Sequence, residues 1–283
     1  MSAAAQTGVG PLLRVWWLRR RRSQLDLSIE VGISARHLSF VETGRSRPSP
    51  AMVERLAEHL EVPLRERNTL LLAAGFAPQH AEHSLDDAAM GPVREALDLV
   101  LRAHEPNPAA VVNRNWNLVA ANASLAVLIE GVDPALLVPP INVLRASLHP
   151  RGMAPRIANL EQWRAHLLQR LARQVALTGD PALSRLLEEG RGYPVPAGDG
   201  RFDTAPADSE IAVPLRIRSG NHHLSFLSTI TTFGTAIEIT ASELSIESFL
   251  PADIGTAEFL CALTPEVIDS ITCPRHRHSL RSR

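Results

Sequence analysis

The sequence predicts a multidomain protein, in which an all-α domain of five short helices precedes an α+β domain with an antiparallel sheet. Helix start and stop signals recur from Leu12 to Ala74, and apolar residues alternate with others from Ile211 to Ile217. A length of 283 residues also exceeds what one small hydrophobic core usually holds. We therefore expect a first domain at residues 8–78, a linker at residues 79–92 and a second domain at residues 93–270.

Capping residues mark the five helices of the first domain. Ser23 begins one helix with Asp26 three residues later, a variant of the capping box, and Ser34 begins the next helix after Gly32 permits a tight turn. This connection is short enough to predict a helix-turn-helix. A proline marks the start of each of the last two helices. The predicted helices are Leu12–Arg22, Gln24–Val31, Ala35–Thr43, Ala51–Leu60 and Leu64–Ala74.

The second domain combines helices with short strands. Two strands are expected on either side of the turn Asn113–Asn115, and Asn122 is expected to cap a helix that runs to Ile129. Alternating apolar residues predict two further strands around the turn Ser219–His222, with another short strand at Thr235–Thr240. The remaining predicted helices are Pro92–Ala103, Leu160–Leu177 and Pro181–Glu189.

Charge is distributed unevenly along the chain. The net charge is −1, but residues 1–80 contain 11 Arg and 7 acidic residues, whereas residues 81–270 contain 14 Arg and 23 acidic residues. A basic domain joined to an acidic one is typical of a chain that meets a polyanion at one end. Residues 271–283 contain 4 Arg and no acid, and we expect them to form a disordered basic tail.

The sequence lacks the signals that mark membrane proteins, secreted proteins, metal-binding proteins and several classes of enzyme. No apolar run approaches 18 residues, and the first arginine cluster follows a very short apolar run, the reverse of a signal peptide. We therefore expect a cytoplasmic protein without a membrane segment. Cys261 and Cys273 lack metal-ligand spacing, and no phosphate-loop, hydrolase or metalloprotease motif occurs. We expect no metal, no cofactor, no catalytic residue and no enzymatic activity.

The helix-turn-helix predicts binding to double-stranded DNA. The second helix of this motif enters the major groove, where its first residues meet base edges. If Leu38 and Val41 face the core, Arg36 projects outward, able to bridge guanine O6 and N7. The residues expected to contact DNA are Gln24, Ser34, Ala35, Arg36, His37, Ser39, Phe40, Arg45 and Arg47.

These DNA-contacting residues fall into two groups. Phe40 is expected to touch a thymine methyl beside Arg36, whereas Gln24, Arg45 and Arg47 are placed to grip phosphates. One alternative is a helical bundle whose arginines merely face solvent. Another is that Phe40 packs under the loop that runs from Arg45 to Pro48.

Long segments of the chain resemble one known family. SQLDLSIEVGISARHLSFVETGRSRPS resembles the Cro/repressor-like, or XRE, regulators, and its end together with PLRERNTLLLAAGFAP is similar to their MmyB-type branch. The similarity continues through HEPNPAAVVNRNWNLVAAN and STITTFGTAIEITASELSIESFLPAD and covers about residues 12–260. The resemblance implies a bacterial-type transcription regulator, with a lambda-repressor-like DNA-binding domain and a PAS-like ligand-binding domain. The resemblance also implies that this second domain contains a ligand pocket, which in a relative is similar to a fatty-acid-binding pocket.

The first helix departs from the family pattern at Trp17. The family usually has an arginine there, able to pair with the acid of the recognition helix. We therefore expect Glu42 to find another partner, such as Arg14 or Arg21. The departure affects this pairing and leaves the predicted fold unchanged.

The expected partners are a second copy of the chain and a small apolar acid. A homodimer on a roughly palindromic operator is expected because one recognition helix reads too few base pairs to be specific. The resemblance implies a fatty-acid-like effector. Alternatively, the second domain serves only for dimerisation or protein interaction, or it is an enzyme that the first domain regulates.

The effector pocket needs apolar walls and a few converging polar groups. Arg145 and His149, four residues apart, would share a helix face and anchor a carboxylate. The alternatives are ordinary core packing for the aromatic residues and a structural pair for Arg145 and His149. The candidate pocket residues are Trp116, Asn142, Arg145, His149, Arg156, Trp163, Phe226 and Phe233.

Overall fold

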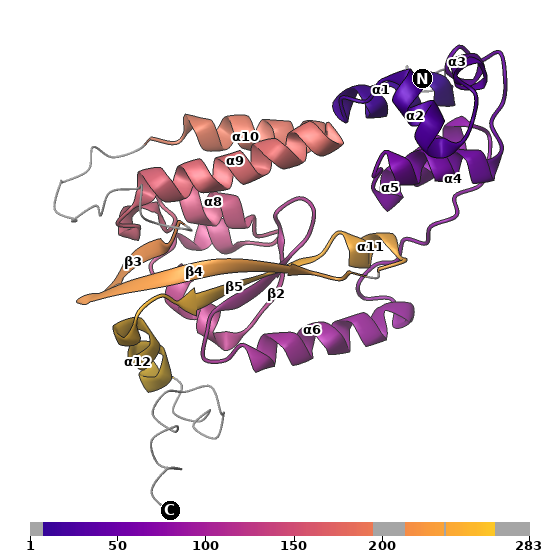
Figure 1. Cartoon of the computed structure of the whole chain (residues 1–283). Coiled ribbons are helices and arrows are strands. Elements are labelled where there is room, and N and C mark those ends of the chain that lie inside the picture. The colour runs from indigo at the N-terminus through magenta and orange to yellow at the C-terminus, as the bar shows by residue number, and fades with distance from the viewer. Residues whose placement is uncertain (1–7, 195–212, 235, 264–283) are drawn as a thin grey trace, which may run out of the picture. The chain divides into compact units, whose positions relative to one another are not determined.

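The computed structural model describes residues 8–194, 213–234 and 236–263, which form two compact units (Figure 1). The first unit contains the described residues up to Asp87 together with those of Gly234–Ser242, and the second contains the others. The first unit thus includes a late segment that the sequence did not assign to it. The predicted strand residue Ile211 and the predicted tail at residues 271–283 lie outside the described residues.

The first five helices of the first unit confirm the predicted all-α domain, and only their ends differ from prediction. Ser23 Oγ accepts a hydrogen bond from the Asp26 amide at 3.1 Å, as the capping signal predicted. The first helix ends early because Arg21 has a left-handed φ of 53°. The five helices are α1 (Val9–Arg19), α2 (Gln24–Val31), α3 (Ala35–Glu42), α4 (Pro50–His59) and α5 (Leu64–Ala73).

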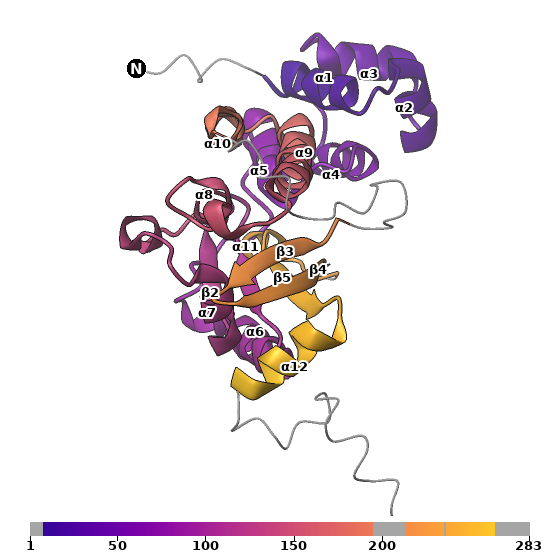
Figure 2. The same cartoon turned by 90° about the vertical axis from the view of Figure 1, so that its left-hand side faces the viewer.

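The core of the first unit fixes how α3 lies. Leu38 and Val41 of α3 are buried, as are Leu13 and Trp17 of α1. Helix α3 contacts both α1 and α2 (Figure 2). Because Leu38 and Val41 pack into the core, the face of α3 that points away from them is free of core contacts.

The first part of the predicted linker is anchored within the first unit. Asn68 Oδ1 accepts hydrogen bonds from the amides of Gln79 at 3.0 Å and His80 at 3.1 Å. Further along, the His83 amide donates to Glu238 Oε1 at 2.8 Å. The Thr240 hydroxyl in turn donates to the His83 carbonyl at 2.7 Å. The chain around residues 79–83 therefore has a defined path.

The predicted strand at Thr235–Thr240 is wrong. Its described part instead leads into the short helix α11 (Ile239–Ser242), which contacts α5. The Ile239 amide bonds to the Ala81 carbonyl at 2.9 Å, and Glu238 Oε2 accepts from the Ala241 amide at 2.7 Å. These contacts override the β-propensity of the Thr and Ile residues, because propensity in strands depends on the surroundings.

The second unit is built on a five-stranded sheet with the order β2-β1-β5-β4-β3. Every neighbouring pair is antiparallel, which confirms the predicted α+β class. Strand β5 was not predicted, because Glu247 and two serines interrupt its apolar pattern. The strands are β1 (Ala109–Val112), β2 (Leu118–Ala121), β3 (Leu215–Ser219), β4 (His222–Thr232) and β5 (Ser245–Pro251).

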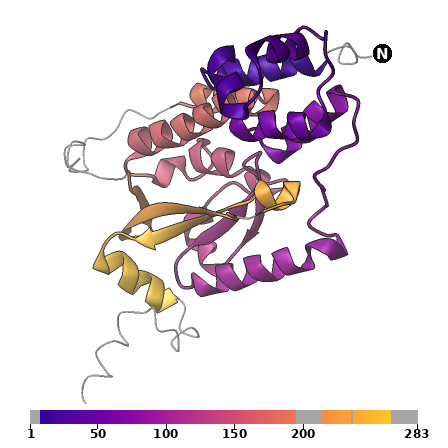
Figure 3. The same ribbon diagram turned by 45° about the vertical axis from the view of Figure 1, so that its right-hand side comes forward.

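Helices cover both faces of this sheet. Helices α8, α9 and α10 lie on one face and α6 runs along the other (Figures 1 and 3). The unpredicted C-terminal helix α12 contacts β4 and β5. The α-helices of this unit are α6 (Gly91–Ala103), α7 (Ala126–Ile129), α8 (Val143–Leu148), α9 (Leu160–Thr178), α10 (Pro181–Gly192) and α12 (Ile254–Leu263). Short 3₁₀ helices are η2 (Ala88–Met90), η3 (Ala123–Leu125), η4 (Pro134–Leu137) and η5 (Ala154–Arg156).

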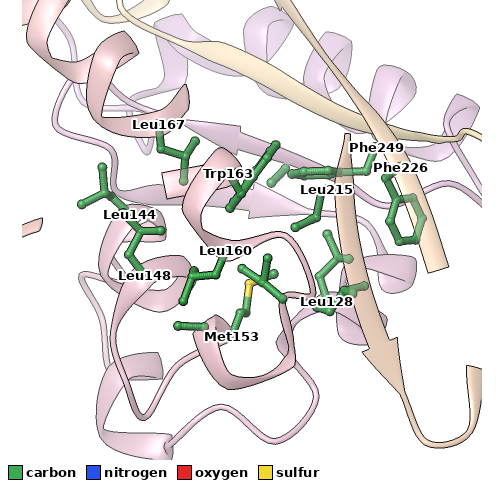
Figure 4. Packing of buried hydrophobic residues seen from close by; sticks show 14 of the residues in the cluster. Leu128, Leu144, Leu148, Met153, Leu160, Trp163, Leu167, Leu215, Phe226 and Phe249 are labelled. Atoms are coloured by element: carbon green, nitrogen blue, oxygen red, sulfur yellow. The ribbon is translucent and has the colours of Figure 1, made fainter. Parts of the chain in front are cut away.

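The main core of the second unit lies between α8, α9 and the sheet. Figure 4 shows Leu144 and Leu148 of α8 and Trp163 and Leu167 of α9 facing this core. Phe249 of β5 meets them from the sheet, within the same buried cluster. The core of the second unit is thus formed by elements that are far apart in the sequence.

Candidate functional sites

The outer face of α3 is the first candidate site. Ser34 Oγ caps α3 by accepting a hydrogen bond from the His37 amide at 3.1 Å, so both residues have a local structural role. Gly32, with φ 71°, ends α2 and makes the tight turn before Ser34. The predicted reading residues Ala35, Arg36, Ser39 and Phe40 are exposed or half-buried.

Arg36 and Phe40 lie together on this face. The Arg36 guanidinium lies over the Phe40 ring, with its carbon 5.3 Å from the ring centroid. These residues are one helical turn apart, which lets their side chains meet. Phe40 is half-buried, so the sequence overestimated its exposure. The carbonyl of Phe40 accepts the amides of Arg45 at 2.8 Å and Ser46 at 3.0 Å, which folds the following loop back on α3.

Arg45 and Arg47 differ in their surroundings. The Arg45 side chain is exposed and makes no ion pair within the described part of the chain. Arg47 instead donates to the carbonyls of Ala74 and Gly75, both at 3.0 Å, and lies over the Phe76 ring at 4.9 Å. Arg47 therefore ties the loop after α3 to the end of α5, a role that the sequence did not reveal.

Replacing Arg47 by alanine should lower stability more than it alters DNA binding. The change leaves two carbonyls without their charged donor, which we expect to cost about 1–2 kcal/mol given its partial exposure. Chemical unfolding measures this loss, and Arg45→Ala is the matched control with little expected cost. A loss of DNA affinity at unchanged stability would instead make Arg47 a phosphate contact.

Gln24 and Glu42 form a polar link between α2 and α3. The Gln24 side-chain amide donates to Glu42 Oε2 at 2.7 Å. Arg14 Nε approaches Glu42 Oε1 at 3.4 Å, which confirms one of the two partners predicted for this acid. Trp17 is buried in the core and leaves the pairing to Arg14. The side chain of Gln24 is thus already engaged, while its place at the start of α2 still suits a phosphate contact.

The second candidate site is an apolar cavity inside the second unit. Its volume is about 130 Å³, and nearly all of its lining is apolar. Strand β1 contributes Ala110 and Val112, whose side chains share one face of the sheet. Trp116, Trp163, Ser147, Glu247 and Phe249 also line it.

Only two of the predicted pocket residues line this cavity, namely Trp116 and Trp163. Trp116 has a left-handed φ of 63° and lies in the turn between β1 and β2. Phe226 is fully buried in the core, with its ring edge-on to Phe249 at 6.5 Å. Phe233 is half-buried and is not part of the cavity wall.

The predicted carboxylate anchor does not lie at this cavity. Arg145 forms two hydrogen bonds of 2.8 Å with Glu189. These bonds hold the pKa of Glu189 below its usual value, so the two residues form an ion pair. His149 Nδ1 accepts the Arg151 amide at 3.0 Å, and its ring lies edge-on to Tyr193. The predicted pair is therefore wrong, since each member has its own partner.

Asn142 and Arg156 also have structural roles. Asn142 Oδ1 caps α8 by accepting the Arg145 amide at 3.2 Å. Arg156 donates to the carbonyls of Arg218 at 2.8 Å and Val127 at 3.0 Å, and so holds the loop before α9 to the sheet. Burial lowers the pKa of Arg156, and carbonyl acceptors offset part of that cost. Neither residue lines the cavity.

Glu247 is the cavity residue that sequence reasoning missed. It is 6% exposed, and it lies in β5 two residues before Phe249. A lone acid within SIESFLP was the available signal, since an acid buried in a central strand needs a partner. Arg170 Nη1 supplies one at 3.2 Å.

The described residues contain no group of three or more His, Cys, Asp or Glu side chains that could hold a metal ion. No described helix is both long and apolar enough to cross a bilayer.

Each candidate site lies within a domain that matches a known family. The helix-turn-helix domain model matches residues 9–70, which include α2, α3 and the loop after them. The model of the MmyB-like transcription regulator ligand binding domain matches residues 93–263, which include the whole sheet and the cavity. No curated protein matches the chain. Since the second model alone covers more than half of the chain, this protein belongs to the MmyB-like family of DNA-binding transcription regulators.

Proposed function

We propose that this regulator binds its operator as a homodimer and that a small apolar effector in the second unit controls binding. The observation that carries the sensing role is the apolar cavity within the matched ligand-binding domain. Small-molecule sites are typically apolar hollows with few polar groups. The apolar lining favours an effector with a fatty-acid-like chain. The regulator acts where its DNA lies, in the cytoplasm, and itself catalyses no reaction.

The proposed DNA surface comprises α3 and the loop after it. Arg36 and Phe40 read bases, and Arg45 contacts phosphate together with the first turn of α2. The exposed positions of Arg36 and Arg45 support this assignment. A dimer doubles the base pairs read and requires two half-sites about one helical turn, or a multiple of it, apart.

The path of the chain supports coupling between effector and DNA. Strand β4 leaves the sheet after Thr232, the chain forms α11 within the first unit, and it returns as β5. Two residues of β5, Glu247 and Phe249, line the cavity. A ligand that shifts β5 therefore also displaces α11, which is hydrogen-bonded to Ala81 and His83. Differential binding of the ligand to two such arrangements shifts their populations.

Filling the cavity should remove the effector response. Ala110→Leu places three additional carbon atoms at the cavity wall, whereas Ala135→Leu makes the same change at an exposed position. The measurement starts with selection of bound fragments from random DNA. The affinity of each variant for the selected DNA is then compared with and without a lipid extract.

We expect the extract to change the affinity of the wild type and Ala135→Leu by about 5- to 150-fold, and to leave Ala110→Leu unchanged. If no protein responds although all bind DNA, the second unit is a dimerisation or protein-interaction module. If Ala110→Leu responds fully, the effector binds elsewhere.

A further inference from the structure

The cavity offers a ligand very few polar side chains. Among its described lining residues, Glu247 is the only ionisable one. The two indole N–H groups are already used, since Trp116 Nε1 donates to Gln174 at 2.7 Å and Trp163 Nε1 donates to Ser147 at 3.0 Å. Glu247 is therefore the strongest polar group that a ligand in the cavity can meet.

Glu247 has one carboxylate oxygen engaged and one available. Oε1 accepts hydrogen bonds from Arg170 Nη1 at 3.2 Å and from the Ser228 hydroxyl at 2.9 Å. Oε2 receives no hydrogen bond from the part of the chain that the structure describes. A buried carboxylate gains from every additional donor, because water no longer solvates it. Its second oxygen therefore remains an acceptor that can receive a hydrogen bond from a ligand.

Arg170 is not placed to receive a ligand carboxylate. Its guanidinium lies over the Trp116 ring at 4.5 Å while it bonds to Glu247, and it does not line the cavity. The other cations proposed as anchors, Arg145 and Arg156, are held by Glu189 and by backbone carbonyls. A carboxylate entering the cavity would face the charge of Glu247 without a cation of its own.

We propose that the cavity selects apolar ligands whose polar end donates a hydrogen bond, with Glu247 Oε2 as the acceptor. An aliphatic alcohol or a protonated aliphatic amine has this chemistry, and an ionised fatty acid does not. Glu247 is then the residue that determines head-group specificity. This inference rests on the proposed function, in that it requires the cavity to hold an apolar effector.

The test uses the full chain and four probes that share a six-carbon chain, namely hexane, 1-hexanol, hexylamine and hexanoate. Binding is followed at pH 7 by the fluorescence of Trp116 and Trp163, which line the cavity, and by calorimetry. We expect 1-hexanol and hexylamine to bind about tenfold or more tightly than hexanoate, since a hydrogen bond to a charged group is worth about 1.5–3 kcal/mol.

Two variants separate this inference from its alternatives. Glu247→Gln keeps the size of the side chain and an acceptor for Arg170, but removes the charge, so hexylamine should lose its advantage over hexanoate. Glu189→Gln removes a carboxylate away from the cavity and should keep that advantage. Hexane binding and the unfolding midpoint show whether each variant retains an intact cavity.

The outcomes are distinguishable. If hexanoate binds wild type as tightly as the alcohol and the amine, or if Glu247→Gln leaves their order unchanged while hexane still binds, the role of Glu247 is overturned and the cavity remains a ligand site. If none of the four probes, hexane included, binds the wild type, the proposed effector site itself fails.

Discussion

Gly10→Ala should destabilise the first unit by about 2 kcal/mol, although alanine is the better helix former. A Cβ at Gly10 would lie 2.2 Å from the Glu42 carbonyl oxygen and 2.7 Å from that of Val41. The main chain of α1 thus meets the end of α3 with no room for a methyl group. Overpacking of about 3 kcal/mol outweighs the gain of about 1 kcal/mol in helix propensity.

The same change should also reduce DNA binding, because α3 must shift to relieve the contact. Hydrogen exchange of peptides from α1 and α3 measures the local loss, and denaturant unfolding gives its free energy. Gly8→Ala is the matched control, since an added Cβ there meets nothing within 4 Å. Equal losses in the two variants would show that the close approach of α1 and α3 is unimportant.

Arg36→Ala should cost about 1–3 kcal/mol of affinity for the selected DNA, roughly tenfold to a hundredfold, and should relax the preference at one base pair. Arg36 is exposed. Within the described part of the chain, its guanidinium contacts only the ring of Phe40. This leaves its guanidinium donors available for guanine. The measurement is a mobility-shift titration on the selected site and on a set of single-base variants.

Two further variants test whether Arg36 acts by shape or by charge. Arg36→Lys keeps the charge but loses the bidentate geometry, so the relaxed preference should persist. Arg45→Ala should weaken all sequences alike and reduce the salt slope by about 1. If Arg36→Ala behaves as Arg45→Ala is expected to, Arg36 contacts phosphate and the bases are read by other residues.

Local signals in the sequence were sufficient for much of the first unit. Caps such as Ser23 and Ser34 act within three or four residues, so the helix starts follow from short stretches of chain. The face of α3 follows from the spacing of Leu38 and Val41. Strands β3 and β4 were also predicted, because alternation of apolar residues is a short-range pattern. Strand β5 was not predicted, because it contains a buried acid.

The state of each arginine could not be predicted in this way. Arg45 and Arg47 are two residues apart in the same loop and both are exposed, yet Arg47 is bound to carbonyls 27 and 28 residues away in sequence. Arg145 pairs with Glu189, 44 residues away. Whether a cation is available to a ligand depends on such distant partners, and sequence spacing carries no information about them.

The sequence by itself determined the two-domain class, the helix-turn-helix and the face that α3 presents, because helix caps and apolar periodicity are short-range effects. Only the tertiary structure decided what lines the cavity, since Ala110, Ser147, Trp163 and Glu247 come from four separate elements. It also decided that α11 replaces the predicted strand, because its hydrogen bonds go to residues near His83. These features depend on contacts between residues far apart in the chain, which packing alone brings together.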